Sequence, residues 1–257
     1  TSVWAHGQAY KGENKTEDLL GNMMLSYANT WGKHKLDVLG LAEVQKKILT
    51  GFYTTVTNFT TDQYGYNNLQ AGAVRLWEGT GSFYESPRLA SFLARINYVY
   101  DGKYVLTANA RADASSKVGE NNRWGFFPGV SVGWNVMEED FWKDSKVSGV
   151  ISNLKPRVSY GVNGNVNGIG NYEVYGEYAQ VESKNYGGAT GLYNSKLLNT
   201  NLRWEQSQTF EVGLDIGFLQ NRLSFILDYY SRDTKDLLTK QALPGYTGFS
   251  DIVTNQG

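Results

Sequence analysis

The sequence predicts an all-β fold, an antiparallel transmembrane β-barrel, from three observations. Strict two-residue alternation of apolar and polar residues fills most of the chain, which is typical of strands with one apolar face. The breaks between these runs are alternately short and long. No apolar run approaches the ~18 residues of a membrane-spanning helix. Alternate turns of an up-and-down sheet share an edge, so tight turns on one edge and long loops on the other indicate a bacterial outer-membrane barrel.

The alternation predicts about nine strands, longer than the usual ~5–6 residues and close to the ~9–11 that cross a bilayer. They are expected at 2–10 (the weakest), 18–31, 35–50, 92–100, 104–113, 126–136, 154–164, 209–218 and 222–238. The tight breaks are 32–34, 101–103 and 219–221, and the long ones are about 51–87, 117–123, 165–201 and from 240 onward.

The apolar faces of these strands carry no charge across their central stretches. A lysine or arginine at the bilayer midplane would cost ~2–4 kcal/mol, so this absence suits a lipid-facing surface. Aromatic residues lie near both ends of the apolar faces, as in the girdles of membrane barrels. Those near the tight turns are Trp31, Tyr100, Tyr104, Trp134 and Phe218, and those toward the loops are Phe92, Phe210 and Tyr229. Alternation alone leaves a soluble β-sandwich open, with the same aromatics in its core.

Composition and motifs argue against an enzyme and against a nucleic-acid partner. The net charge is −1, cysteine is absent, and the only histidines are His6 on the weakest strand and His34 in a tight turn. No P-loop, H-E-x-x-H or G-x-S-x-G motif occurs. We therefore predict no catalytic residue, no metal-binding residue and no cofactor, although acidic and Asn-rich loops leave calcium open. The absence of a signal peptide favours an internal piece of a longer polypeptide.

A series of short motifs in a fixed order carries a family resemblance. They include Arg95-x-Asn97-Tyr98, Arg111-x-Asp113-x-Ser115-Ser116, Asn122-Arg123-Trp124-Gly125, Gly133-Trp134, Gly213-x-Asp215 and Asp228-Tyr229-Tyr230. With them, the sequence resembles the SusC/RagA-like family of TonB-dependent outer-membrane transporters, strongly over 89–257 and loosely over 17–50. It departs at Ala114, often glycine in the family, at Lys117-Val118, and at Pro156, where we expect irregular strand pairing.

The resemblance implies a function for the whole protein. Residues 1–257 would be part of a 22-stranded barrel, multi-pass in the outer membrane of a Gram-negative cell and in contact with its lipid. The plug domain, the TonB box and the C-terminal strands would lie outside this chain. Such transporters import oligosaccharides or peptides, with a SusD-like surface lipoprotein as lid and with TonB and its inner-membrane energising complex acting on the missing N-terminal region. The alternative is an outer-membrane or soluble β-sandwich that binds or adheres without transport.

The aromatic residues of the long loops are the candidates for binding substrate or the lid. They are Tyr53, Phe59, Tyr64, Tyr66, Trp77, Tyr84, Tyr175, Tyr178 and Tyr186. Aromatics among Asn, Gln, Thr and Gly suit stacking on sugars, and tyrosine and tryptophan also anchor protein partners. Packing of loop against loop is the third interpretation of the same residues.

The charged residues of the polar faces are candidates for facing the lumen or the plug. They are Arg95, Arg111, Asp113, Arg157, Glu211, Asp215 and Asp228. Cross-strand ladders and contacts with the plug are the favoured interpretations, and direct contact with substrate is a weaker one. We expect Asp215 to pair with Arg222 across a tight turn. Glu138-Glu139-Asp140 is expected to open a short helix at about 138–146 whose Phe141 and Trp142 pack on the periplasmic rim.

Overall fold

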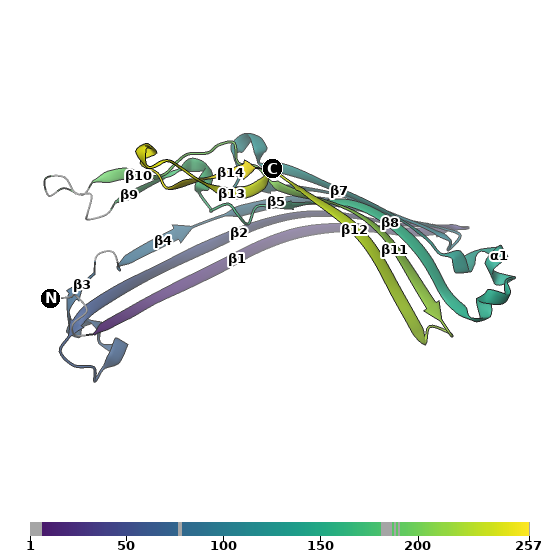
Figure 1. Ribbon diagram of the computed structural model, residues 1–257, viewed down its shortest axis with the longest axis horizontal. Helices are drawn as coiled ribbons and strands as arrows, with labels where there is room; N and C mark the ends of the chain where they lie inside the picture. Colours follow the sequence, from purple (N-terminus) through teal and green to yellow (C-terminus); the bar gives the residue numbers. More distant parts are fainter. Residues whose placement is uncertain (1–6, 77–78, 181–186, 188, 190, 257) are drawn as a thin grey trace.

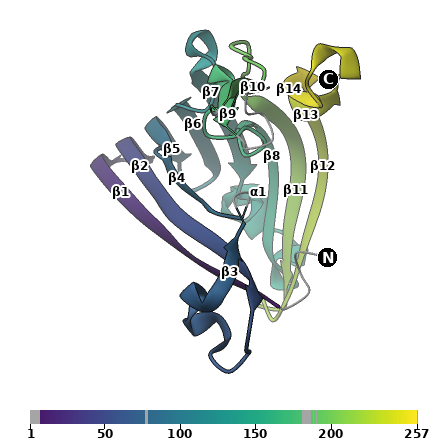
Figure 2. The ribbon, with the colours of Figure 1, turned by 90° about the vertical axis from the view of Figure 1, so that its left-hand side faces the viewer.

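The fold is one antiparallel path of eight long strands, in a computed structural model that describes residues 7–76, 79–180, 187, 189 and 191–256. Figures 1 and 2 show these strands side by side in an open arc. In order along the sheet they are β1 (Gln8–Trp31), β2 (His34–Phe59), β5 (Arg88–Tyr100), β6 (Tyr104–Ser115), β7 (Trp124–Trp134), β8 (Ile151–Asn165), β11 (Glu205–Phe218) and β12 (Leu223–Lys235). The predicted all-β antiparallel barrel fold is confirmed, with part of a barrel in this chain.

The remaining elements are short. Two strands pair back on β2, namely β3 (Gly72–Arg75) and β4 (Gly81–Glu85), and two hairpins are formed by β9 (Glu177–Gln180) with β10 (Leu192–Lys196) and by β13 (Leu237–Ala242) with β14 (Asp251–Gln256). The helical turns are η1 (Gly65–Asn67), η2 (Leu69–Ala71), η3 (Glu120–Asn122), η4 (Val136–Glu138), α1 (Asp140–Lys143), η5 (Lys146–Gly149), η6 (Glu173–Tyr175) and η8 (Gly245–Thr247). Among the described residues, no helix has the length and apolar character needed to cross a membrane.

The three tight turns lie where the sequence predicts them. Gly32 opens the first turn with φ 57°, and Asp101 and Gly102 have φ 53° and 68° in the second. Residues 219–221 of the third turn are all left-handed, although none is glycine. Figure 1 shows the β11–β12 turn and α1 at one end of the sheet and the β9–β10 hairpin with β3 and β4 toward the other. The segregation of tight turns from long loops is therefore confirmed.

Several predicted boundaries are wrong. The count of about nine long strands is too high, because residues 8–10 of the expected first strand begin β1, which continues without a break to Trp31. The expected loop at 51–87 begins with the last nine residues of β2, from Gly51 to Phe59, and also contains β3 and β4. These strand segments are rich in polar residues and glycine and lack the alternation of apolar and polar residues. Strands that do not border an apolar environment need no such alternation.

Two further elements differ from expectation. The strand expected at 222–238 breaks at Asp236, whose φ is 55° and whose carboxylate forms an ion pair with Arg203. The helix expected at about 138–146 is reduced to the single turn α1, flanked by η4 and η5. Of its two aromatics, Phe141 packs on the ring of Trp134, the last residue of β7, with centroids 6.4 Å apart. Pro156 fits the predicted irregularity, since the β7–β8 ladder ends at Arg157 while β8 continues to pair with β11.

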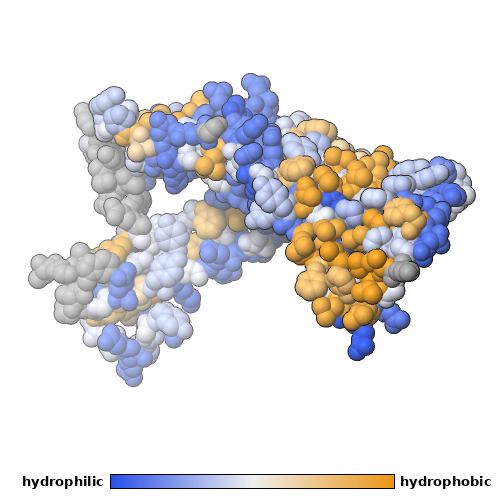
Figure 3. All heavy atoms as spheres, turned by 45° about the vertical axis from the view of Figure 1, so that its right-hand side comes forward, coloured by the Kyte–Doolittle hydropathy of each residue, from blue (hydrophilic) through white to orange (hydrophobic). Residues whose placement is uncertain are grey.

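The register brings like faces together across the whole sheet. Ala94 of β5 lies opposite Gly40 of β2 and Ala110 of β6, and the same alignment repeats on every long strand. We call this surface the apolar face. Its central residues are Met23, Leu25, Tyr27, Val38, Gly40, Ala42, Phe92, Ala94, Ile96, Leu106, Ala108, Ala110, Val130, Val132, Val158, Tyr160, Phe210, Val212, Leu214, Phe225, Leu227 and Tyr229. Figure 3 shows hydrophobic side chains gathered over the half of the sheet that ends in the tight turns.

The apolar face is open, not packed into a core. Met23 and Leu25 are 75% and 73% exposed, and no second sheet covers this face in the described part of the chain. The aromatics lie at its two ends as predicted, with Tyr100 stacked on Tyr104 beside a tight turn. Toward the loops, Phe92 stacks on Trp124 with ring centroids 5.9 Å apart. A sandwich core, the alternative for these aromatics, is not found there.

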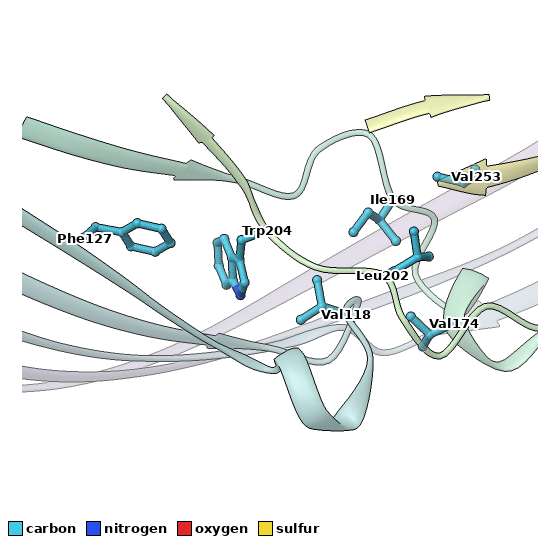
Figure 4. Packing of buried hydrophobic residues seen from close by; sticks show 7 residues of the cluster. All are labelled: Val118, Phe127, Ile169, Val174, Leu202, Trp204 and Val253. Carbon is cyan, nitrogen blue, oxygen red and sulfur yellow. The ribbon is translucent and has the colours of Figure 1, made fainter. Parts of the chain in front are cut away.

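The buried core lies among the loops and not between the strands. Its residues are Val118, Phe127, Ile169, Val174, Leu202, Trp204 and Val253, which come from three loops and from the strands β7 and β14 (Figure 4). Gly119 permits the closest approach, because a Cβ there would lie 1.8 Å from the carbonyl oxygen of Thr200. The ring of Trp204 meets Phe127 edge-on at 5.3 Å, and its Nε1 donates to the carbonyl oxygen of Arg123. This loop core fixes the long loops to the end of the sheet.

Leu202→Ala is expected to loosen the loops and leave the sheet intact. Leu202 is fully buried, and truncating such a side chain costs ~2–5 kcal/mol. Hydrogen exchange in the full-length protein should accelerate at residues 166–176 and 197–204 and stay slow in the long strands. Tyr246→Ala is the control, because Tyr246 is 91% exposed. Equal exchange of these loops in the two variants would contradict the role of this core.

Candidate functional site

Three aromatic rings gather on the polar face, the surface opposite the apolar face, at the loop end of β1, β2 and β4. Tyr10 and Tyr53 stack with ring centroids 6.5 Å apart, and Phe83 lies on the neighbouring strand, two residues along from the partner of Tyr53. All three rings are exposed, by 61%, 36% and 39% respectively. We call them the aromatic patch. Tyr53 is one of the candidates predicted from the sequence, and Tyr10, on β1, is not.

Glycines give these rings the space to lie along the sheet. A Cβ on Gly51 would come within 2.6 Å of the Phe83 ring, and one on Gly81 within 2.7 Å of the Tyr53 hydroxyl. A Cβ on Gly12 would lie 2.8 Å from the Tyr10 hydroxyl. Each ring therefore covers the backbone of a glycine and presents a face to solvent. Flat, exposed rings of this kind can stack on sugar rings or on peptide groups.

The other predicted loop aromatics are distributed over separate parts of the loop end. Phe59 and Tyr66 line a hollow of about 300 Å³ beside η1, and Tyr64 is exposed next to it. Tyr84 and Tyr175 line a larger cleft of about 1160 Å³. Tyr178 is 72% exposed on β9. Trp77 and Tyr186 lie outside the described residues. The structure thus brings Tyr84 and Tyr175 together and leaves Tyr178 apart.

Two long loops that are far apart in sequence contact each other at this end. The hydroxyl of Tyr172 accepts a hydrogen bond from the backbone N–H of Ser86 at 2.9 Å, and Asn171 donates from its amide to the carboxylate of Glu85. These contacts join the segment before β5 to the segment after β8. Some loop aromatics therefore take part in loop packing, the third interpretation of the sequence.

Arg157 is the centre of a charge cluster on the polar face. Its Nη1 and Nη2 contact Glu211 and Asp228, and its Nε lies 3.5 Å from Oδ1 of Asp215. Gly213 stands directly opposite Arg157, and a Cβ there would lie 2.6 Å from the guanidinium carbon. The missing side chain lets the guanidinium lie across β11 and reach β12. Asp215 pairs with Arg157, its diagonal neighbour on β8, and not with Arg222.

The remaining predicted polar-face charges differ in their surroundings. The Nε of Arg111 donates to both carboxylate oxygens of Asp113 at 2.8 Å, and its Nη2 donates to Ser91 at 3.0 Å. Asp113 and Ser91 are buried. Arg95 is exposed and forms no ion pair among the described residues. In place of one cross-strand ladder of charges, the structure has an ion pair within β6 at Arg111 and a cluster at Arg157 that spans three strands.

A second charge cluster ties the tight turns together. Lys103 lies 3.0 Å from Glu139 and 3.7 Å from Asp101, which Lys33 of the neighbouring turn contacts at 2.8 Å. Glu139 also accepts hydrogen bonds from the Tyr104 hydroxyl at 2.7 Å and from Trp134 at 3.1 Å. These donors, Tyr104 first and then Lys103, hold the pKa of Glu139 below its ordinary 4.5. Lys33 likewise lowers the pKa of Asp101.

The described residues offer no catalytic constellation. His34 contacts the Tyr98 hydroxyl through Nδ1 at 2.6 Å and lies between the rings of Trp31 and Tyr100, so it packs as part of the aromatic girdle. His6 lies outside the described residues. In the part of the chain that the structure describes, no three His, Cys, Asp or Glu side chains are grouped so that they could hold a metal ion. Calcium in the loops stays a prediction.

Comparison with known proteins gives the family. The family described as TonB dependent receptor-like, beta-barrel matches residues 4–257. The chain is 35% identical to TonB-dependent receptor P3 of Formosa agariphila over 98% of this chain and 25% of that protein. It is 38% identical to TonB-dependent receptor SusC of Bacteroides thetaiotaomicron over 65% of this chain and 17% of that protein. A structure of the RagAB peptide transporter is similar with a TM-score of 0.81 and 26% identity, over 97% of this chain and 27% of that chain.

Long antiparallel strands, an open and uncharged apolar face and a charged polar face define the class, the wall of a transmembrane β-barrel. Within that class, the chain belongs to the TonB-dependent receptor-like β-barrel family. The resemblance to SusC/RagA-like members is confirmed by the similarity to SusC and to RagAB. The chain spans about a quarter of the length of receptor P3.

Arg157→Gln is expected to destabilise the sheet by about 1–3 kcal/mol, because three carboxylates are left facing one another. The magnitude is below that of a fully buried pair, since Arg157 and Glu211 are 31% and 30% exposed. Adding Glu211→Gln should restore part of the loss. Urea unfolding of the full-length protein in detergent measures this, with Arg95→Gln as the matched control. Equal midpoints for Arg157→Gln and the control would contradict the cluster's role.

Glu139 is expected to make the tight-turn end sensitive to acid. Its pKa is depressed in the folded protein, so its stabilisation is present above pH 4.5 and is lost as the pH falls through the lower folded value. Stability measured between pH 7 and pH 3 should fall less steeply in Glu139→Gln than in the wild type. Glu138→Gln is the control, because Glu138 contacts only the exposed Lys143 at 3.4 Å. Parallel curves for wild type and Glu139→Gln would show that Glu139 has no such role.

Proposed function

We propose that the chain forms part of the barrel wall of a TonB-dependent importer of large nutrients in the outer membrane of a Gram-negative cell. The observation that carries the proposal is the family membership of nearly the whole chain, together with the two unlike faces of its sheet. The apolar face meets lipid and its two rows of aromatics lie at the membrane interfaces. The polar face lines the lumen.

The energy for import comes from TonB, which acts on parts of the protein beyond this stretch of wall. The wall's contribution is a charged inner surface against which a plug can rest. Arg157 and its three carboxylates carry one formal positive and three formal negative charges. Arg111 and Asp113 present a neutral pair on the same face. A plug surface that carries basic residues opposite the Arg157 cluster would complement it.

The cargo we propose is an oligosaccharide or a peptide, met first by the aromatic patch. The rings of Tyr10, Tyr53 and Phe83 lie on the lumenal side at the loop end, where a nutrient enters. Stacking on three rings favours an extended, flat molecule over a compact ion. The similar RagAB structure is of a peptide transporter, which supports the peptide half of this class.

A SusD-like surface lipoprotein is the partner we propose for the loops. The loop core holds the loops that carry Val118, Val174 and Leu202 in one arrangement, so this part of the loop end presents a preformed surface. Tyr64, Tyr66 and Tyr178 are exposed on that end, by 56%, 63% and 72%. Exposed tyrosines on a rigid support are typical anchors of a protein interface. Neither chemistry nor turnover is part of the proposed role.

Tyr53→Ala in the full-length receptor is expected to weaken cargo binding roughly five- to tenfold, as loss of one aromatic stack does. The probes are fluorescein-labelled oligosaccharides or peptides from a nutrient on which cells grow only when the receptor is present. Tyr53→Phe should bind as the wild type does, and Tyr246→Ala serves as the exposed control. Uptake should also stop when TonB is deleted. Unchanged cargo binding by Tyr53→Ala would contradict the role of the aromatic patch. Uptake that continues without TonB would contradict the assignment as a TonB-dependent transporter.

A further inference from the structure

The apolar face carries a groove lined only by apolar residues, with a volume of about 380 Å³. Its floor is made of small residues, Gly40, Ala94 and Ala110, which lie opposite one another in the register of β2, β5 and β6. Met23, Phe92 and Phe126 rise around it. With no polar group in reach, an occupant that fits this groove has to be hydrocarbon, because an unpaired polar group would be penalised there.

A larger cleft continues the groove toward the loops on the same face. Ala94 and Phe92 line the groove and Ala90 and Arg88 line the cleft, at two-residue steps along β5. Side chains at such steps share one face of the sheet. The cleft is also lined by Leu20, Gln45 and Leu89 of the polar face, and Lys46, Arg88 and Ala90 form its apolar-face side. Arg88 lies four residues beyond Phe92, or roughly 13 Å along the strand.

The cleft holds two cations in direct opposition. Lys46 of β2 and Arg88 of β5 are paired residues in the ladder, on the same face. Like charges directly opposite each other destabilise a sheet. Neither side chain forms an ion pair within the described part of the chain, and no aspartate or glutamate lines the cleft. The backbone of Arg88 is fixed by hydrogen bonds with Ser116 in both directions, so the pair cannot separate freely.

Two buried polar atoms at the same place also lack partners. The hydroxyl oxygen of Ser86 and the Nε of Arg123 are buried without a hydrogen bond, and both residues line the cleft. Arg123 adds a third positive charge. Cations without a counter-charge beside a purely apolar groove are complementary to one kind of molecule, an anionic head on a hydrocarbon tail.

We propose that this surface is a specific site for an anionic, phosphate-bearing lipid of the outer leaflet. The phosphate lies between Lys46 and Arg88, and an acyl chain runs down the groove over Gly40. A phosphate between the two cations removes their repulsion. The site depends on the apolar face being in the membrane, and it is separate from the lumenal aromatic patch. It would fix one lipid beside the wall and hold the loop end at the headgroup level.

The test adds dimyristoyl phosphatidylglycerol or dimyristoyl phosphatidylcholine to the delipidated full-length protein. Native mass spectrometry then measures how much of each lipid stays bound. The wild type is expected to retain phosphatidylglycerol in preference to phosphatidylcholine. Lys46→Gln with Arg88→Gln should weaken phosphatidylglycerol retention roughly thirty-fold, about fivefold for each cation near a membrane surface, and leave phosphatidylcholine unchanged.

A second variant tests the groove independently of charge. An added Cβ on Gly40 meets nothing within 4 Å, so Gly40→Leu fills the groove without a clash and should weaken retention of both lipids. Val212→Leu and Lys235→Gln are the matched controls, since they lie on the same face on β11 and β12, away from the groove. An unchanged lipid preference in the double variant, or full retention in Gly40→Leu, would overturn the proposal. Nutrient uptake measured in the same variants tests the proposed transport independently of lipid binding.

Discussion

The register between neighbouring strands is the constraint on which every other feature depends. Side chains alternate along a strand, so a slip of one residue would move a whole row of apolar side chains to the lumenal face. Three tight turns set the pairing of β1 with β2, β5 with β6 and β11 with β12, and their left-handed residues leave little freedom in loop length. Once the register is set, the uncharged apolar band, the aromatic rows and the Arg157 cluster all follow. The side chains of Glu211, Asp215 and Asp228 all reach Arg157 only because the register places the four residues on the same face of the sheet.

Glycine determines how side chains lie on the polar face that this register creates. A ladder with a side chain at every position would hold long residues upright, away from the backbone of the next strand. Gly213 lets the guanidinium of Arg157 cross a strand, and Gly51 lets the ring of Phe83 lie flat. In both places a Cβ would come within 2.6 Å of the neighbouring group. The ring faces of the aromatic patch and the compact charge cluster are therefore products of missing side chains as much as of those present.

The features predicted from sequence are those set by local chemistry. Alternation located the central parts of the long strands, and the turns at 32–34, 101–103 and 219–221 followed from glycine and polar residues. Two kinds of feature could not be found this way. The extensions of β1 and β2 toward the loops mix polar, glycine and aromatic residues on both faces, so alternation has no signal there. Partners across strands depend on register, which is why Asp215 was assigned to Arg222 and not to Arg157, and why Tyr10 was missed as the ring that stacks on Tyr53.

The two faces treat charge in opposite ways, and the contrast bears on the lipid site. On the lumenal face, Arg157 is surrounded by carboxylates on two neighbouring strands, so the fold supplies its own counter-charges. On the apolar face, the same ladder geometry places Lys46 opposite Arg88 and supplies none. Both arrangements arise from pairing that the register dictates, yet only the first is compensated within the described residues. The compensating charge for the second has to come from outside the protein, and the surface beneath it admits only hydrocarbon. A barrel wall that stands in an anionic leaflet meets such a molecule at the height of this pair.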